Sequence, residues 1–240
     1  MKPTLAAALL AVLLPGFAAA ADTTPDKADD IFALCRDTRA GVQTRLAACT
    51  AAAIGRPDDV ALRYAYARAQ QRAGDKDGAA ESYERAAEAG HAGAQAALGS
   101  IYMRGRAGAA PDRALALRWY EQAASQGHVS AQAVTGFLYF NGAGDRQDFA
   151  RAAAWMKKAA WQGASEAQFG LGALYAQGKG VKTDPVQALM WFLVAAGKMP
   201  PGPERDAVLQ YRASVAVSLS PDEIHEAGRL AAEWRALEGR

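Results

Sequence analysis

The chain has 240 residues, of which 51% are hydrophobic and 22% charged, a composition that excludes a disordered chain. Its 27 basic and 25 acidic residues leave a net charge of +2, without the basic, aromatic-interleaved stripe typical of a nucleic-acid-binding protein. At this length the chain forms one or two compact domains, or one solenoid.

Residues 1–21 are predicted to be a cleaved signal peptide. Met1-Lys2 supplies a positive n-region, residues 5–14 an apolar core, and residues 18–20, all alanine, a small-residue cleavage site. The apolar core is too short to span a bilayer, which takes about 20 residues. We therefore expect export to the periplasm or secretion, and no membrane span; an uncleaved anchor is the alternative.

Residues 22–56 are predicted to be an N-terminal capping hairpin closed by a disulfide between Cys35 and Cys49, the only cysteines. In one straight helix their Cα atoms would lie about 21 Å apart, whereas a disulfide needs about 4.4–6.8 Å. Gly41 lies almost midway, and a turn there would bring the two cysteines face to face. An exported chain permits the bond. A metal site is not expected, because no histidine lies near and two ligands are too few.

Residues 57–199 repeat a pattern with a period of 36 or 37 residues. The motif Ala-Gln-x-x-x-Gly begins at Ala94, Ala131 and Ala167. Other residues recur downstream in the same register: Tyr102, Tyr139 and Tyr175; Gly105, Gly142 and Gly178; Asp112, Asp148 and Asp184; Trp119, Trp155 and Trp191. Such a period predicts stacked helix–turn–helix units. We place them at residues 57–91, in degenerate form, and at 92–128, 129–164 and 165–199.

Residues 200–240 are predicted to form two C-terminal capping helices. The segment Pro200-Pro201-Gly202-Pro203 breaks the chain before the first of them. Ser220 and Glu223 form a capping box that begins the second, which carries an apolar stripe ending at Trp234. A hairpin here would cover the last repeat, whose core face would otherwise be exposed.

The complete pattern in residues 167–196, Ala-Gln-x-x-Leu-Gly-x-x-Tyr followed by Gly-x-Gly-Val-x-x-Asp and Ala-x-x-Trp-x-x-x-Ala-Ala, resembles the Sel-1-like repeat family, relatives of tetratricopeptide repeats. The resemblance covers residues 92–197 well and 60–91 loosely. It implies an all-α, right-handed α/α superhelical solenoid of about six helical hairpins, and a role as an adaptor that assembles complexes. A bacterial branch with a disulfide in each repeat is not matched, because residues 92–197 contain no cysteine.

No catalytic residue is predicted, and we expect a protein that is not an enzyme and has no cofactor or metal. The chain lacks the nucleophile elbow, the Ser-x-x-Lys pair and the phosphate loop of known enzyme classes. His91 and His128 share one repeat position and are interpreted as turn residues between repeats. The three repeated aspartates are interpreted as caps at the start of second helices.

The candidate binding residues are those that depart from the repeat on the first helix of each unit. In related hairpins the first helices line the concave face, and exposed apolar surface there marks an interaction site. The candidates are Tyr64, Met103, Phe137, Phe140 and Phe169, with Arg68 and Glu166 adding orientation. The alternative is that tight superhelical curvature buries these side chains between neighbouring repeats.

We therefore expect a monomeric, exported scaffold that binds a protein or peptide of unknown identity in this groove. One alternative is a protein that binds peptidoglycan or another polysaccharide, which requires the repeated aromatic side chains to be exposed. A second is a cell-wall hydrolase or penicillin-recognising enzyme, which would need a nucleophile and base that the sequence does not show. A third is a self-associating module, against which the charged last helix argues.

Overall fold

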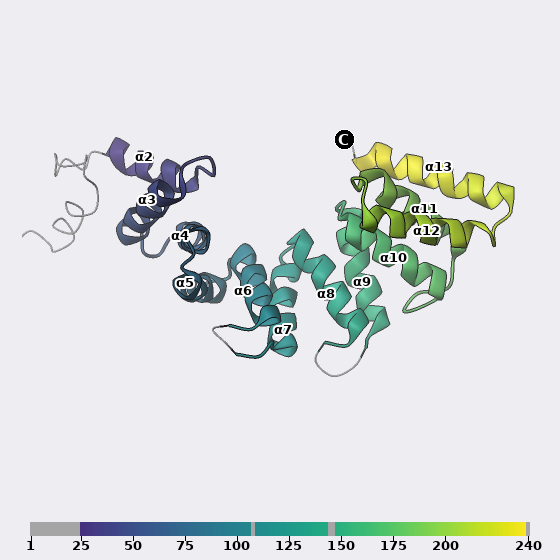
Figure 1. Ribbon diagram of the computed structural model, residues 1–240, viewed down its shortest axis with the longest axis horizontal. Coiled ribbons are helices and arrows are strands. Elements are labelled where there is room, and N and C mark those ends of the chain that lie inside the picture. The colour runs from purple at the N-terminus through teal and green to yellow at the C-terminus, as the bar shows by residue number, and fades with distance from the viewer. Residues whose placement is uncertain (1–24, 107–108, 144–146, 239–240) are drawn as a thin grey trace, which may run out of the picture. The chain divides into compact units, whose positions relative to one another are not determined.

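The computed structural model describes residues 25–106, 109–143 and 147–238 of the chain (Figure 1). Over these residues it contains twelve α-helices and no β-strand, which confirms the all-α prediction. The chain divides into two compact units, Met1–Ile101 and Tyr102–Arg240, and each is described by itself. The predicted signal peptide, residues 1–21, lies outside the described residues. Within the described ranges, every helix is too short or too polar to cross a membrane.

The first unit contains α2 (Pro25–Arg36), α3 (Val42–Gly55), α4 (Val60–Ala73), α5 (Lys76–Glu88) and most of α6 (Ala92–Arg104). Neighbouring helices pack in chain order, α2 on α3, α3 on α4 and α4 on α5. The turn between α2 and α3 includes Gly41, as predicted. Cys35 and Cys49 face each other across it and form the predicted disulfide, with Cα atoms 4.6 Å apart. Both cysteines are fully buried in a small core that includes Leu62 of α4.

The second unit contains α7 (Arg113–Ser125), α8 (Val129–Asn141), α9 (Phe149–Trp161), α10 (Ser165–Gln177), α11 (Pro185–Lys198), α12 (Pro203–Ala216) and α13 (Pro221–Glu238). Helices α7 to α11 pack consecutively. At the repeated glycines of the first helices, the second helix of the same hairpin approaches closely. A Cβ on Gly136 would lie 2.7 Å from Met156 of α9, and one on Gly172 would lie 2.8 Å from Phe192 of α11. The hairpin packing is that of the predicted solenoid class.

The repeated aspartates cap the second helices, as the sequence indicates. The carboxylates of Asp112, Asp148 and Asp184 each accept a hydrogen bond of 2.8–2.9 Å from the backbone N–H three residues later. The two repeated histidines cap the N-termini of first helices in the same way. Nδ1 of His91 and of His128 accepts from the backbone N–H three residues on, at 3.2 Å in both cases. These hydrogen bonds satisfy donors that a helix N-terminus leaves without an intrahelical partner.

The repeated glutamine ties each first helix to the second helix before it. The buried side chains of Gln95, Gln132 and Gln168 donate from Nε2 to the backbone carbonyl eight residues earlier, at 3.1, 3.1 and 3.2 Å. Each of these carbonyls lies in the last turn of a second helix. Carbonyls in a last turn have no intrahelical donor. The glutamine therefore fixes the angle at which one hairpin follows another.

We expect loss of the imidazole cap in the variant His128→Ala to lower the free energy of unfolding by about 1 kcal/mol, within the ~0.5–2 kcal/mol typical of N-caps. The equivalent position before α10 is Ala164, which makes no side-chain cap, so Ala164→Ser should raise stability by up to about 1 kcal/mol. Urea unfolding followed by circular dichroism measures both. Ser130→Ala, an exposed change in the same helix, is the control and should shift stability by less than about 0.5 kcal/mol. An unchanged midpoint in His128→Ala would contradict the capping role.

The last two helices depart from the predicted hairpin, because α12 and α13 both pack chiefly on α11. Helix α13 begins with the predicted capping box, in which Glu223 accepts from the backbone N–H of Ser220 at 2.8 Å. Its apolar side carries Trp234, whose ring lies edge-to-face with Trp191 at 5.9 Å. In this arrangement α13 covers α11 much as α10 covers α9.

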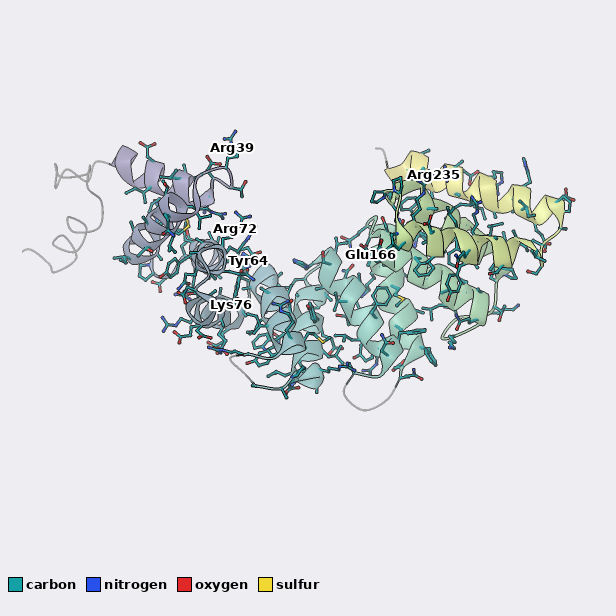
Figure 2. The ribbon with its side chains drawn as sticks, in the orientation of Figure 1. Arg39, Tyr64, Arg72, Lys76, Glu166 and Arg235 are labelled. Carbon is teal, nitrogen blue, oxygen red and sulfur yellow. A yellow bond between two sulfur atoms is a disulfide. The ribbon has the colours of Figure 1, made fainter. Side chains whose placement is uncertain are left out.

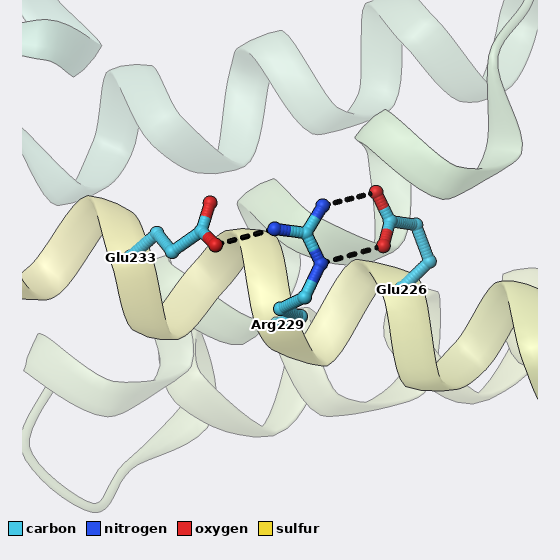
Figure 3. Close-up of polar contacts among 3 residues, drawn as sticks. All are labelled: Glu226, Arg229 and Glu233. Atoms are coloured by element: carbon cyan, nitrogen blue, oxygen red, sulfur yellow. Dashed lines mark hydrogen bonds and ion pairs between the residues drawn. The ribbon is translucent and has the colours of Figure 1, made fainter.

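The opposite side of α13 is charged. The guanidinium of Arg229 is held by the carboxylate of Glu226, through bonds of 2.8 and 2.6 Å, and by that of Glu233 (Figure 3). The hydrogen bonds that Arg229 donates to Glu226 are the main reason that the pKa of Arg229 is raised. Because these side chains are about half exposed, the ion pairs add little to stability. Their main effect is to keep this side of the C-terminal helix solvated.

Candidate functional site

The apolar first-helix candidates of the second unit are half-buried, and the three phenylalanines pack against neighbouring side chains. Met103 lies in the last turn of α6 and Phe137 in α8. The ring of Phe137 reaches α10, where it lies 3.5 Å from the place that a Cβ on Gly170 would take. The side chain also contacts the main core of the unit. The glycine at position 170 therefore leaves room for the ring of the preceding first helix.

Phe140 packs against the second helix of its own hairpin. Its ring lies edge-to-face with that of Phe149, with centroids 5.4 Å apart. The ammonium group of Lys179 lies 5.5 Å from the Phe140 ring and 5.2 Å from the Phe149 ring. This cation–π contact joins the turn after α10 to the α8–α9 hairpin. Gly180, beside the lysine, has a φ of +70° and no space for a Cβ against the backbone of Phe149.

Phe169 is covered by the chain itself. Its ring contacts Phe192 of α11 at 5.8 Å and Tyr211 of α12 at 5.3 Å. Helix α12 thus lies over α10, the first helix of the last repeat, at this point. Glu166, one turn earlier in α10, is exposed (Figure 2). Part of the candidate strip is thus in contact with α12, and part keeps accessible ring surface.

Tyr64 and Arg68 belong to the first unit and form a separate surface. The Tyr64 ring stacks on the imidazole of His91, with centroids 4.2 Å apart and planes inclined by 26°. The ring also lies over the start of α6, where a Cβ on Gly93 would come within 2.9 Å of it. The guanidinium of Arg68 lies 5.8 Å above the same ring. Tyr64 therefore helps to hold α6 onto α4, with one edge accessible.

A buried arginine lies on α3, the helix that packs on α4. Arg45, in the first turns of α3, is only 3% exposed, and its Nε donates to the carbonyl oxygen of Cys35 at 2.9 Å. Its Nη1 is enclosed and has no hydrogen-bond partner. Burial, followed by the positive charges of Arg72 and Arg68, lowers the pKa of Arg45. Burial also raises the pKa of Tyr83, to about 12, with Tyr64 adding to the effect.

Two exposed aromatic residues, Trp161 and Tyr211, were not among the predicted candidates. Trp161, the last residue of α9, is 54% exposed and lies edge-to-face with Trp191 at 6.1 Å. The equivalent positions of the other units carry Glu88, Ser125 and Gly197. A tryptophan where other repeats have small or polar residues was a signal available in the sequence. Trp161 lies on a second helix, whereas the predicted candidates all lie on first helices.

The repeated aromatic residues are buried or half-buried. Trp191 and Tyr139 are buried, at 3% and 7% exposure, and Trp119 and Trp155 are half-buried. A buried ring cannot stack on a sugar. Over the part of the chain that the structure describes, no three His, Cys, Asp or Glu side chains come together in a way that would hold a metal ion.

Comparison with known proteins identifies the repeat. The family model for the Sel1 repeat matches residues 61–91, 92–128, 129–163 and 165–198, together more than half of the chain. No curated protein matches the chain. The boundaries that we predict for the capping segments, 22–56 and 200–240, stay predictions.

Among the solved structures that share the fold are two Sel1-like repeat proteins. One is c5321, a protective antigen of uropathogenic Escherichia coli strains with an SLR fold; it is 28% identical, with a TM-score of 0.71 over 86% of this chain. This chain covers only 44% of c5321, less than half of its length. The other, a Sel1 repeat protein from Oxalobacter formigenes, is 23% identical with a TM-score of 0.61, over 82% of this chain and 86% of its own.

Proposed function

The chain belongs to the Sel1 repeat family, and we propose that it is an exported, monomeric, non-catalytic scaffold that binds a protein or peptide on the first-helix side of its repeats. One observation carries the proposal. Met103 and Phe137 depart from the repeated core set, yet they are apolar and only half-buried on successive first helices. An apolar side chain with accessible surface at a variable repeat position is typical of a binding anchor.

The remaining candidates have different parts in this proposal. Phe140 and Phe169 contact Phe149 and Tyr211, so they shape the surface more than they anchor a partner. Glu166 is exposed in the first turn of α10 and would orient a partner by charge. Tyr64 and Arg68 would contact a partner at the first unit.

Export is proposed from two observations. The first is the composition of residues 1–21. The second is the disulfide between Cys35 and Cys49, because disulfides persist in oxidising compartments and are rare in the cytosol.

Site-specific photo-crosslinking tests the binding surface without removing a core side chain. A benzophenone amino acid would be placed at Met103 or Glu166 in one set of chains. In the control set it would be placed at Arg118 or Lys157, which are exposed on second helices. After irradiation in cells, we expect a discrete protein adduct from the first set and none from the second. Equal adducts from both sets, or no adduct from either, would contradict the proposal.

Polysaccharide binding is a second candidate, favoured by Trp161 alone. Its ring has an accessible face, and exposed lysines Lys157 and Lys158 lie in the preceding turn. Sedimentation with purified peptidoglycan tests this candidate. Retention of the wild type and release of Trp161→Ser would support it, whereas Glu166→Gln, a change on a first helix, should be retained like the wild type. A chain that stays in the supernatant would rule it out.

A further inference from the structure

The first unit contains a buried positive charge that forms no ion pair with any described residue. The guanidinium of Arg45 has one hydrogen-bond partner among the described residues, the carbonyl oxygen of Cys35. Buried charges in proteins are normally paired with an opposite charge and fully hydrogen-bonded, because taking an ion out of water costs much free energy. Arginine cannot escape this cost by losing its proton.

Two further arginines lie next to it. Arg68 and Arg72 are one turn apart on α4, in line with Tyr64, and so project from one face of that helix. Figure 2 shows Tyr64 and Arg72 on the same side of α4. Helix α4 packs on α3, the helix that carries Arg45. After burial, the positive charges of Arg72 and Arg68 are the next causes of the lowered pKa of Arg45, in agreement with the packing of α4 on α3.

No carboxylate of the described residues forms an ion pair with any of the three arginines. The acidic group that acts on Arg45 from a distance is Asp37. Its carboxylate is engaged by Arg39, through the backbone N–H at 2.9 Å and Nε at 3.3 Å. These bonds to Arg39 are the main reason for the lowered pKa of Asp37. Among the described residues, none of the three cations therefore has a carboxylate partner in direct contact, and Asp37 acts on Arg45 only from a distance.

We propose that Arg45, Arg68 and Arg72 form a binding site for an oxyanion, that is, for a carboxylate or phosphate group. The planar guanidinium donates two parallel hydrogen bonds to either group. An oxyanion bound by Arg68 and Arg72, on the helix that packs on α3, would bring a negative charge towards Arg45. Tyr64, beside Arg68, would contact the apolar part of the molecule that carries the anion. The site lies within the first unit and does not depend on the surface formed by Met103 and Phe137.

Nuclear magnetic resonance of the arginine side chains tests the site directly. The mature chain with its disulfide intact would be titrated with sodium phosphate and, separately, with sodium acetate, with ionic strength held constant by sodium chloride. We expect saturable shifts of the Nε–Hε signals of Arg45, Arg68 and Arg72. Saturation by acetate alone would assign the site to carboxylates, and saturation by phosphate alone would assign it to phosphates. Either result supports the site.

A charge-matched pair of variants separates a site from general attraction. Arg72 is exposed and should be replaceable without loss of the fold. In Arg72→Gln we expect affinity to fall by about tenfold or more, as for loss of a charge-assisted hydrogen bond. Arg85→Gln removes an exposed arginine from α5, in the same unit, and should leave affinity unchanged. The proposal fails if neither anion gives saturable shifts, or if both variants weaken binding equally. Loss of photo-crosslinks at Met103 would leave this result unaffected, so the two proposals can fail separately.

Discussion

The variant Trp234→Ala is expected to destabilise the second unit by about 3–5 kcal/mol, the cost typical of removing a buried tryptophan. Trp234 is 4% exposed, and its ring contacts that of Trp191 at 5.9 Å. The ammonium group of Lys198 lies 5.0 Å from the same ring. Ala227 and Ala231, fully buried on the same side of α13, are too small to keep the helix in place alone.

Urea unfolding followed by tryptophan fluorescence and by circular dichroism measures this effect. The matched control is Leu237→Ala, in the same helix but 61% exposed, which should change stability by less than about 0.5 kcal/mol. Similar small losses in the two variants would show that α13 is dispensable. A large loss for Trp234→Ala alone would establish α13 as the cap of the α11 surface.

The repeat part of the fold could be predicted from the sequence because its determinants are local. Glycines at positions of close approach, aspartates at helix starts and the cysteine pair on either side of Gly41 each act within one hairpin. The sequence predicts that α12 and α13 cover the last repeat, but not that both pack on α11 rather than chiefly on each other, because an apolar stripe such as that ending at Trp234 does not specify its partner. The capping box at Ser220 gives the start of α13 but not the surface that the helix covers.

The binding surfaces were harder to predict for the same reason. A departure from the repeat marks a position as variable but does not give its exposure. Phe169 and Trp161 both depart from the repeat, yet Tyr211 covers the first while the second is 54% exposed. In the sequence, Arg45 cannot be told apart from an arginine on a solvated helix face. Its burial depends on how the α2–α3 hairpin closes, which is a tertiary property.

Loss of the disulfide is expected to lower the stability of the first unit by about 3 kcal/mol, the chain-entropy value for a closed loop of about 15 residues. The variant Cys35→Ala/Cys49→Ala would show this loss in urea unfolding. Reduction of the wild type with dithiothreitol should give the same midpoint, because both treatments remove the same cross-link. Hydrogen exchange would locate the effect. We expect amides of α2 and α3 to lose protection, while amides of α10 and α11, in the other unit, keep theirs.

Loss of the disulfide should also weaken anion binding at the proposed site. The carbonyl oxygen of Cys35 accepts from Nε of Arg45 and so orients the buried guanidinium. When α2 is no longer held to α3, Arg45 gains access to water, and the free-energy cost that an oxyanion relieves becomes smaller. Phosphate or acetate should therefore bind the double variant more weakly than the wild type. Equal affinity would mean that Arg68 and Arg72, which are both on α4, form the site without the buried arginine.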